Sequence, residues 1–192
     1  MNISTKYLTN KRVIVTSAPG SGSTSYSLYL SDNLVNDNFL IYYDLSGSID
    51  REFVKKHYNN FYNKGIFVTG NLKNLFKLIV EVEEVLDVLI VDSADIMMVD
   101  KNAINNLLQL SKVRKFTLLC TSQIRQDPTK NIYSTIERLD YNFDYSIWIR
   151  NVTEKEGLLV SKYIDVFDEK RIGNKYIERF ICYFSKTGAV IE

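Results

Sequence analysis

The chain has 192 residues and a mass of 22.3 kDa, and 45% of its residues are hydrophobic, which suits one domain with a substantial core and leaves little room for two. Its 24 Lys and Arg residues balance 23 Asp and Glu residues, so the net charge of +1 excludes a global field that attracts nucleic acid or acidic membranes. Apolar runs such as 13–15 and 88–91 are far shorter than the roughly 20 residues of a membrane helix. Residues 1–11 also lack the apolar segment of a secretory signal. We therefore expect one soluble, cytoplasmic domain over 1–192, with 1–11 as a short N-terminal extension and no membrane partner.

Strand and helix patterns alternate along the chain up to residue 121. An apolar, β-branched run at 12–16 predicts the first strand, and Tyr26, Leu30 and Leu34 recur after it at helical spacing. Further strands are predicted at 39–43, 66–69, 88–92 and 116–121, and further helices are marked by Ile49, Phe53 and His57, by Leu72, Leu75, Phe76 and Ile79, and by Ile104, Leu107 and Leu108. This alternation is typical of a doubly wound α/β fold, with a mostly parallel sheet covered by helices on both faces.

After residue 140 the strand patterns follow one another without helices between them. They lie at 145–150, 158–166 and 176–184, and residues 171–175, which include Gly173, are typical of a hairpin turn. The sequence therefore predicts that the sheet ends in a C-terminal antiparallel hairpin extension.

The cysteines and the single histidine argue against a metal centre. Cys120 and Cys182 lie in apolar runs, where a buried, reduced thiol is expected rather than a disulfide or a metal ligand. His57 is the only histidine and lies in a polar helical stretch, where a surface position is expected. Neither a zinc site nor a Ser-His-Asp triad is predicted.

The small-residue segment 17–24 joins the first predicted strand to the first predicted helix. A phosphate-binding loop with the spacing G-x-x-x-x-G-K-[ST] surrounds phosphates with backbone N–H groups, a lysine and a hydroxyl that binds Mg²⁺. Gly22 and Thr24 fit this spacing, whereas Ser17 replaces the first glycine and Ser23 replaces the lysine. The alternative is a plain strand-to-helix turn in which Ser23 or Thr24 caps the helix. The candidate nucleotide-binding residues of this segment are Gly20, Ser21, Gly22, Ser23 and Thr24.

A second motif is the acid that ends the apolar strand 88–92. In nucleotide-binding folds such a carboxylate orients Mg²⁺ beside the phosphate loop. Asp92 and Thr24 are therefore the candidate Mg²⁺ ligands if a nucleotide binds. The expected cofactor is either none or weakly bound ATP or ADP with Mg²⁺.

This order of motifs resembles the RecA family of strand-exchange recombinases, including RadA and the phage relatives. The resemblance covers 13–191 and rests on the strand-loop-helix at 13–30, the strand at 39–44 and the Val-Asp-Ser sequence at 91–93. The most family-like segment is 118–125, Leu-Leu-Cys-Thr-Ser-Gln-Ile-Arg. The resemblance implies that Gln123 senses the γ-phosphate and that a DNA-binding loop begins there.

The candidate DNA-binding loop is segment 122–138. Cations, amides and an aromatic residue are mixed along it, which suits a single-stranded backbone and stacked bases. Asp127 and Glu137 dilute its positive charge, so a solvated connector is the alternative. The candidate DNA-binding residues are Arg125, Lys130, Tyr133 and Arg138.

Departures from the family pattern predict a pseudo-ATPase without catalytic residues. The resemblance implies a water-activating glutamate at the position of Ser46, and a serine cannot act as that base. Ser23 removes the lysine as well, so two separate parts of the hydrolytic apparatus are missing. Residues 1–11 leave little room for the family's subunit-gripping segment, so we expect no long filaments, although self-association stays open.

Three functions are consistent with these residues. The first is a silent recombinase relative that acts in DNA recombination, repair or replication by binding single-stranded DNA, an active recombinase or a replication protein. The second is an unusual ATPase in which Lys11, Lys112 or a neighbouring subunit's lysine replaces the missing one. The third is a scaffold subunit of a viral or replicative assembly. Frequent Asn, Ile, Lys and Tyr suggest an AT-rich genome such as that of a phage, in which case the protein acts in the host cytoplasm.

Overall fold

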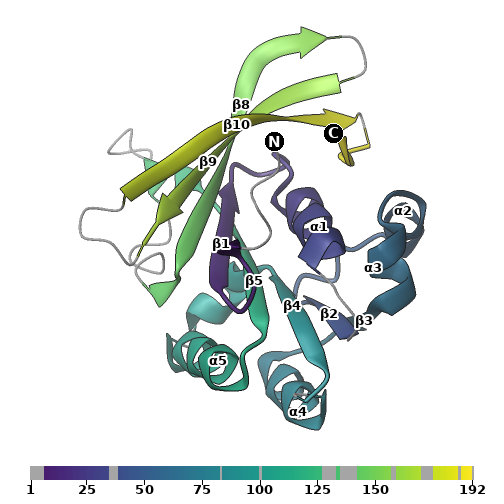
Figure 1. Cartoon of the computed structure of the whole chain (residues 1–192), viewed down its shortest axis with the longest axis vertical. Coiled ribbons are helices and arrows are strands. Elements are labelled where there is room, and N and C mark those ends of the chain that lie inside the picture. Colours follow the sequence, from purple (N-terminus) through teal and green to yellow (C-terminus); the bar gives the residue numbers. More distant parts are fainter. Residues whose placement is uncertain are drawn as a thin grey trace.

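A computed structural model describes residues 7–34, 39–82, 84–99, 101–126, 133–134, 142–156, 159–169, 175–185 and 187–191. In this part of the chain one sheet has nine strands in the order β11-β10-β9-β8-β1-β5-β4-β2-β3, with helices on both of its faces (Figure 1). The strands are β1 (Arg12–Ser17), β2 (Phe39–Asp44), β3 (Gly65–Thr69), β4 (Leu86–Asp92), β5 (Thr117–Gln123), β8 (Tyr145–Glu156), β9 (Leu159–Asp168), β10 (Lys175–Ser185) and β11 (Val190–Ile191). The helices are α1 (Ser23–Leu34), α2 (Arg51–His57), α3 (Asn59–Lys64), α4 (Leu72–Val82), α5 (Lys101–Arg114) and the 3₁₀ helix η2 (Ala94–Val99).

The sheet has a parallel part and an antiparallel part, which confirms the predicted fold class. Strands β8, β1, β5, β4, β2 and β3 are parallel, whereas β9, β10 and β11 are antiparallel to their neighbours. Strand β8 joins the two parts, because it is antiparallel to β9, as expected, and parallel to β1, from Val13 opposite Tyr145 to Ser17 opposite Ile149. The predicted turn residues 171–174 lie outside the described residues, although the pairing of Lys175 with Asp168 makes β9 and β10 antiparallel neighbours.

The helices bury their apolar stripes on opposite faces of the sheet. Helices α1, α2 and α3 pack on one face, and α4, η2 and α5 pack on the other. Tyr26, Leu30 and Leu34 are buried, as their helical spacing predicted. This two-sided covering explains why the central strands are almost continuously apolar.

The helix predicted around 49–57 is two short helices. The Asp50 side chain accepts hydrogen bonds from the backbone N–H groups of Glu52 and Phe53, so α2 begins after Asp50 and leaves Ile49 outside it. The chain leaves helical geometry at Tyr58, where φ is −134°, and α3 follows. His57, at the end of α2, is partly covered and lies 4.9 Å from the Phe53 ring, and this burial lowers the pKa of its imidazole.

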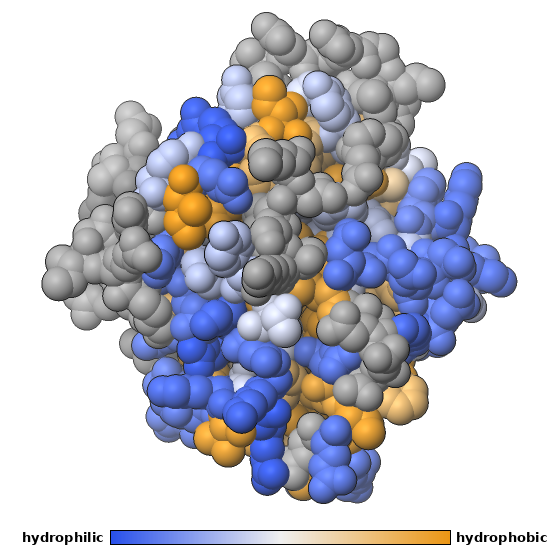
Figure 2. All heavy atoms as spheres, in the orientation of Figure 1, coloured by the Kyte–Doolittle hydropathy of each residue, from blue (hydrophilic) through white to orange (hydrophobic). Residues whose placement is uncertain are grey.

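The two cysteines differ in burial, although both were expected to be buried. Cys120 is buried, Cys182 is half-buried, and both are free. No group of three or more His, Cys, Asp and Glu side chains within the described ranges could hold a metal ion. Likewise, no helix in those ranges is long and apolar enough to cross a membrane. Figure 2 shows hydrophilic side chains over α2 and α3, whose outward positions are charged or amide residues.

Candidate phosphate-binding site

The segment between β1 and α1 is a strand-to-helix loop at the carboxyl edge of the parallel strands. Its two glycines have positive φ angles, +70° at Gly20 and +99° at Gly22. Ser21 N–H donates to the Ala18 carbonyl at 3.0 Å, and Tyr26 N–H donates to the Gly22 carbonyl at 2.9 Å, which starts α1. The predicted context of a phosphate loop is therefore present, because backbone amides follow one another around a turn at a helix N-terminus.

The carboxylate that ends β4 lies against the start of α1. Thr24 Oγ1 donates to Asp92 Oδ2 at 2.8 Å, and the hydroxyls of Tyr42 and Thr121 also donate to Asp92. Burial, with the Asp92 charge as the next cause, raises the pKa of Tyr42, so this phenol stays a donor. The alternative prediction was that Thr24 caps the helix through its side chain. In the structure the Thr24 hydroxyl instead donates a hydrogen bond to Asp92.

Thr24 and Asp92 fit a magnesium ion that keeps most of its water. Mg²⁺ is held by few protein oxygens together with phosphate oxygens and water. The two predicted ligands come from different elements, α1 and β4, and the fold brings their oxygens together. With a nucleotide bound, the ion would neutralise phosphate charge at this edge.

Two solved structures share this architecture. No family model and no curated protein sequence matches the chain. The RadB recombinase structure superposes with a TM-score of 0.67 at 13% identity, covering 96% of this chain and 92% of the other. A KaiC-like protein from the hyperthermophilic archaeon Pyrococcus horikoshii OT3 gives the same TM-score and identity, covering 96% of this chain and 90% of that one. The fold is RecA-like.

In this RecA-like fold, Ser46 occupies the turn that follows β2. Ser46 Oγ donates to Asp44 Oδ1 at 2.7 Å and lies 2.7 Å from Ser48 Oγ. Asp44 also accepts hydrogen bonds from the N–H groups of Ser46, Gly47 and Ile49, so its carboxylate closes the turn. The position that the resemblance assigns to the catalytic base holds a hydroxyl bonded to its neighbours.

Gln123 lies at the same edge as the phosphate loop. It ends β5 opposite Ser17, and the next residue, Ile124, donates its N–H to the Ser17 carbonyl at 2.8 Å. Asp95 of η2, which the sequence analysis did not single out, accepts from the Gln123 N–H at 2.9 Å and from the Ser93 hydroxyl at 2.8 Å. The backbone of Gln123 is thus fixed beside the loop, and its side chain is exposed.

The candidate DNA segment 122–138 contains a two-stranded ribbon that begins two residues after Gln123. Strands β6 (Arg125–Gln126) and β7 (Tyr133–Ser134) pair antiparallel, with Arg125 opposite Ser134. The side chains of Arg125 and Tyr133, and all of Lys130 and Arg138, lie outside what the structure describes. The DNA contacts of these four residues therefore remain predictions.

A lysine from the C-terminal hairpin reaches the phosphate loop. Lys162 of β9 is only 7% exposed, its Nζ donates to the Ser21 carbonyl, and its ammonium lies 4.8 Å from the centroid of the Phe184 ring. Burial lowers the pKa of Lys162. The sequence analysis did not assign Lys162 to the site. The available signal is that Lys162 shares one face of β9 with the buried Ile164 and Val166, so a charged residue stands in an apolar series.

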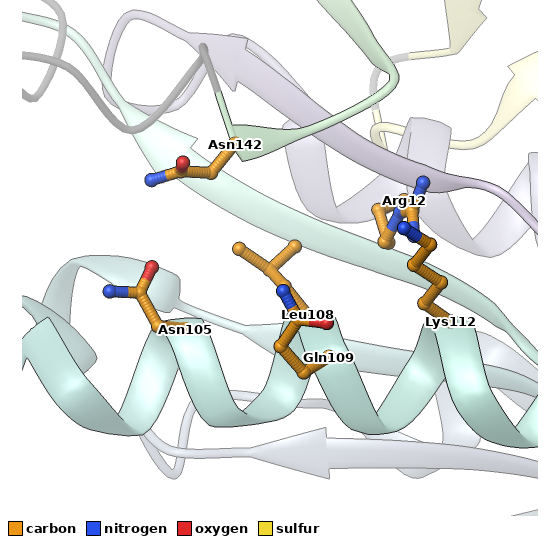
Figure 3. A pocket seen from close by; sticks show the side chains of 6 residues that line it. All are labelled: Arg12, Asn105, Leu108, Gln109, Lys112 and Asn142. Carbon is orange, nitrogen blue, oxygen red and sulfur yellow. The ribbon is translucent and has the colours of Figure 1, made fainter.

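The two named lysine candidates lie at the wrong edge of the sheet. Lys11 precedes β1, and the strand from Arg12 to Ser17 rises about 3.3 Å with each residue, so its length separates Lys11 from the loop. Lys112 of α5 points toward Arg12 in a pocket of about 200 Å³ (Figure 3). The pocket is lined by Arg12, Asn105, Leu108, Gln109, Lys112 and Asn142. Neither lysine can reach a phosphate at residues 18–24 of the same chain.

Proposed function

We propose that this protein is a RecA-like accessory protein of DNA recombination, repair or replication that binds single-stranded DNA or an active recombinase and does not hydrolyse ATP. The fold shared with RadB recombinase supports the DNA-related part of this proposal. Serines at positions 23 and 46, where the RecA family has a lysine and a glutamate, support the absence of hydrolysis. A protein with this role would act in the cytoplasm, of the host if a phage encodes it.

The proposal that the protein does not hydrolyse ATP rests on the surroundings of Ser46. Hydrolysis needs a group that accepts a proton from the attacking water, and a serine hydroxyl is far too weak a base at neutral pH. The nearest carboxylate along the chain, Asp44, accepts four hydrogen bonds from its own turn. Asp95 is likewise engaged by Ser93, Ser122 and the Gln123 backbone. Binding of a nucleotide without turnover is the chemistry that this arrangement favours.

The position of the β6–β7 ribbon supports a role on DNA. The ribbon starts two residues after Gln123, which lies opposite Ser17, so the predicted DNA segment leaves the sheet at the edge that carries the phosphate loop. Arg125, Lys130 and Arg138 would neutralise backbone phosphates, and Tyr133 would stack on a base. In this proposal nucleotide occupancy adjusts the DNA segment without supplying energy from hydrolysis.

The test combines ATP turnover with DNA binding. We expect no ATP turnover above the buffer rate by the native protein, with or without single-stranded DNA. The double variant Ser23→Lys and Ser46→Glu restores the two missing charges and should gain turnover if only they are missing. We expect fluorescence anisotropy with a labelled single strand to report binding that weakens steeply with salt.

Three results would redirect the proposal. Metal-dependent turnover by the native protein would favour the unusual ATPase. Salt-insensitive or absent DNA binding, together with no binding to a recombinase, would favour the scaffold role. The variant Arg125→Ala with Arg138→Ala should reduce the number of released counterions, and an unchanged salt slope would remove those residues from the DNA site.

A further inference from the structure

Lys162 is a buried cation without a counter-charge in the described part of the chain. The ammonium group has three N–H donors, and one of them is used by the Ser21 carbonyl. No ion pair between Lys162 and a carboxylate is found among the described residues, and Asp165 of the same strand pairs with Arg150 and Arg179 instead. A buried charge is costly unless an opposite charge or a full set of hydrogen bonds compensates it. Among the described residues the ammonium has the Ser21 carbonyl and the face of the Phe184 ring as partners, and neither of them carries a full negative charge.

The fold holds this cation against the loop from a distant part of the sequence. Lys162 lies 141 residues from Ser21 and reaches it because β9 and β10 continue the sheet past β8. The end of β10 lies close to the start of α1, because Phe184 contacts Gly22. In Figure 1 the C-terminal end of the chain lies near α1. Phe184 of β10 packs on Gly22, where an added Cβ atom would lie 2.7 Å from the ring.

The Tyr58 hydroxyl also connects β11 to the first turn of α1. The Tyr58 hydroxyl donates to the Ser25 carbonyl at 3.1 Å and accepts from the Val190 N–H at 3.2 Å. The C-terminal hairpin is thereby fixed to the first turn of α1, and Lys162 is held at a defined place beside the loop. A fixed cation beside a glycine-containing turn at a helix N-terminus is an arrangement that favours phosphate groups.

We propose that Lys162 supplies in cis the positive charge missing at Ser23, and that it binds the phosphate chain of a nucleoside di- or triphosphate at residues 18–24. The inference rests on the proposed function and names the ligand class of that same site. A bound phosphate would balance the charge of the buried ammonium, and Thr24 and Asp92 are the residues that would hold Mg²⁺. The competing explanation is that Lys162 only fastens β9 to the loop.

Binding of Mg-ADP, of a non-hydrolysable ATP analogue and of inorganic pyrophosphate, measured by calorimetry, tests the proposal. We expect Lys162→Met to weaken binding of the nucleotides about tenfold to a hundredfold, the range for losing one charge-assisted contact. Lys162→Arg should retain most of the affinity, because the charge stays. Lys77→Met is the matched control, since Lys77 is an exposed lysine of α4 and its loss should change nothing.

Stability separates the ligand role from the fastening role. If the main role of Lys162 is to bind phosphate, Lys162→Met should leave the melting temperature of the ligand-free protein unchanged or higher. The rise in melting temperature that nucleotide causes in the native protein should then disappear. A lower melting temperature with unchanged nucleotide affinity would overturn the proposal. If the Met variant does not fold, amide chemical shifts of the native protein during an ADP titration replace it, and shifts must appear at Gly20, Ser21 and Gly22.

The other outcomes are equally decisive. No binding of any probe at millimolar concentration, or equal affinities of ADP and pyrophosphate, would overturn the nucleotide assignment. Affinity is measured without reference to turnover. ATP hydrolysis would therefore refute the proposed function, while the Lys162 variants alone decide the role of the cation.

Discussion

Replacing Gly22 with alanine tests the contact between the C-terminal hairpin and the phosphate loop. The new Cβ atom would lie 2.7 Å from Phe184 Cε1, and Phe184 is only 2% exposed, so its ring has little free space to move into. Overpacking of this kind costs about 1–3 kcal/mol. The positive φ of +99° adds about 1–2 kcal/mol for any residue with a Cβ atom. We expect Gly22→Ala to lower the free energy of unfolding by about 2–5 kcal/mol.

Gly20→Ala is the matched control for this experiment. Gly20 has a φ of +70° but nothing within 4 Å of an added Cβ atom, so only the backbone cost of about 1–2 kcal/mol applies. Urea unfolding of both variants gives the contact by difference, and Phe184→Leu in the Gly22→Ala background should recover part of it. If Gly22→Ala were no more destabilising than Gly20→Ala, the hairpin would not pack on the loop as described.

Three further predictions concern buried polar groups. Thr24→Val removes the 2.8 Å hydrogen bond to Asp92 and should cost about 1.5–3 kcal/mol in urea unfolding. A change smaller than about 0.5 kcal/mol would mean that the bond is not formed. Asp144→Asn leaves the Arg12 guanidinium without its buried partner and should cost about 3–5 kcal/mol, whereas a neutral result would contradict this ion pair. Burial raises the pKa of Cys182 to about 11, so its reaction with a disulfide reagent should accelerate about tenfold per pH unit from pH 7 to 10, and a plateau near pH 8 would contradict that burial.

The alternation of strands and helices made the layered core predictable from the sequence. The helical spacing of Tyr26, Leu30 and Leu34 identified the buried face of α1, because that periodicity depends only on local geometry. The direction of β8 was not predictable in the same way. An alternating strand pattern carries no information on whether its neighbour is parallel, and β8 pairs with β1 across more than a hundred residues.

The candidate site was likewise predictable only where it depends on local sequence motifs or on the common edge of parallel strands. The loop with Gly20 and Gly22 was recognisable, because a phosphate loop is a contiguous motif between a strand and a helix. The contact of Thr24 with Asp92 followed from the rule that parallel strands end at one edge. Lys162 could not be assigned, since its contact with the loop depends on the pairing of β8, β9 and β10 and not on any local pattern.

The fate of bound nucleotide in a single turnover tests the central claim most directly. With the protein in excess over radiolabelled Mg-ATP, the label should remain in ATP over hours, even though binding depends on Lys162. Conversion of the bound ATP to ADP and phosphate by the native protein, with loss of that conversion in Thr24→Val, would contradict the account.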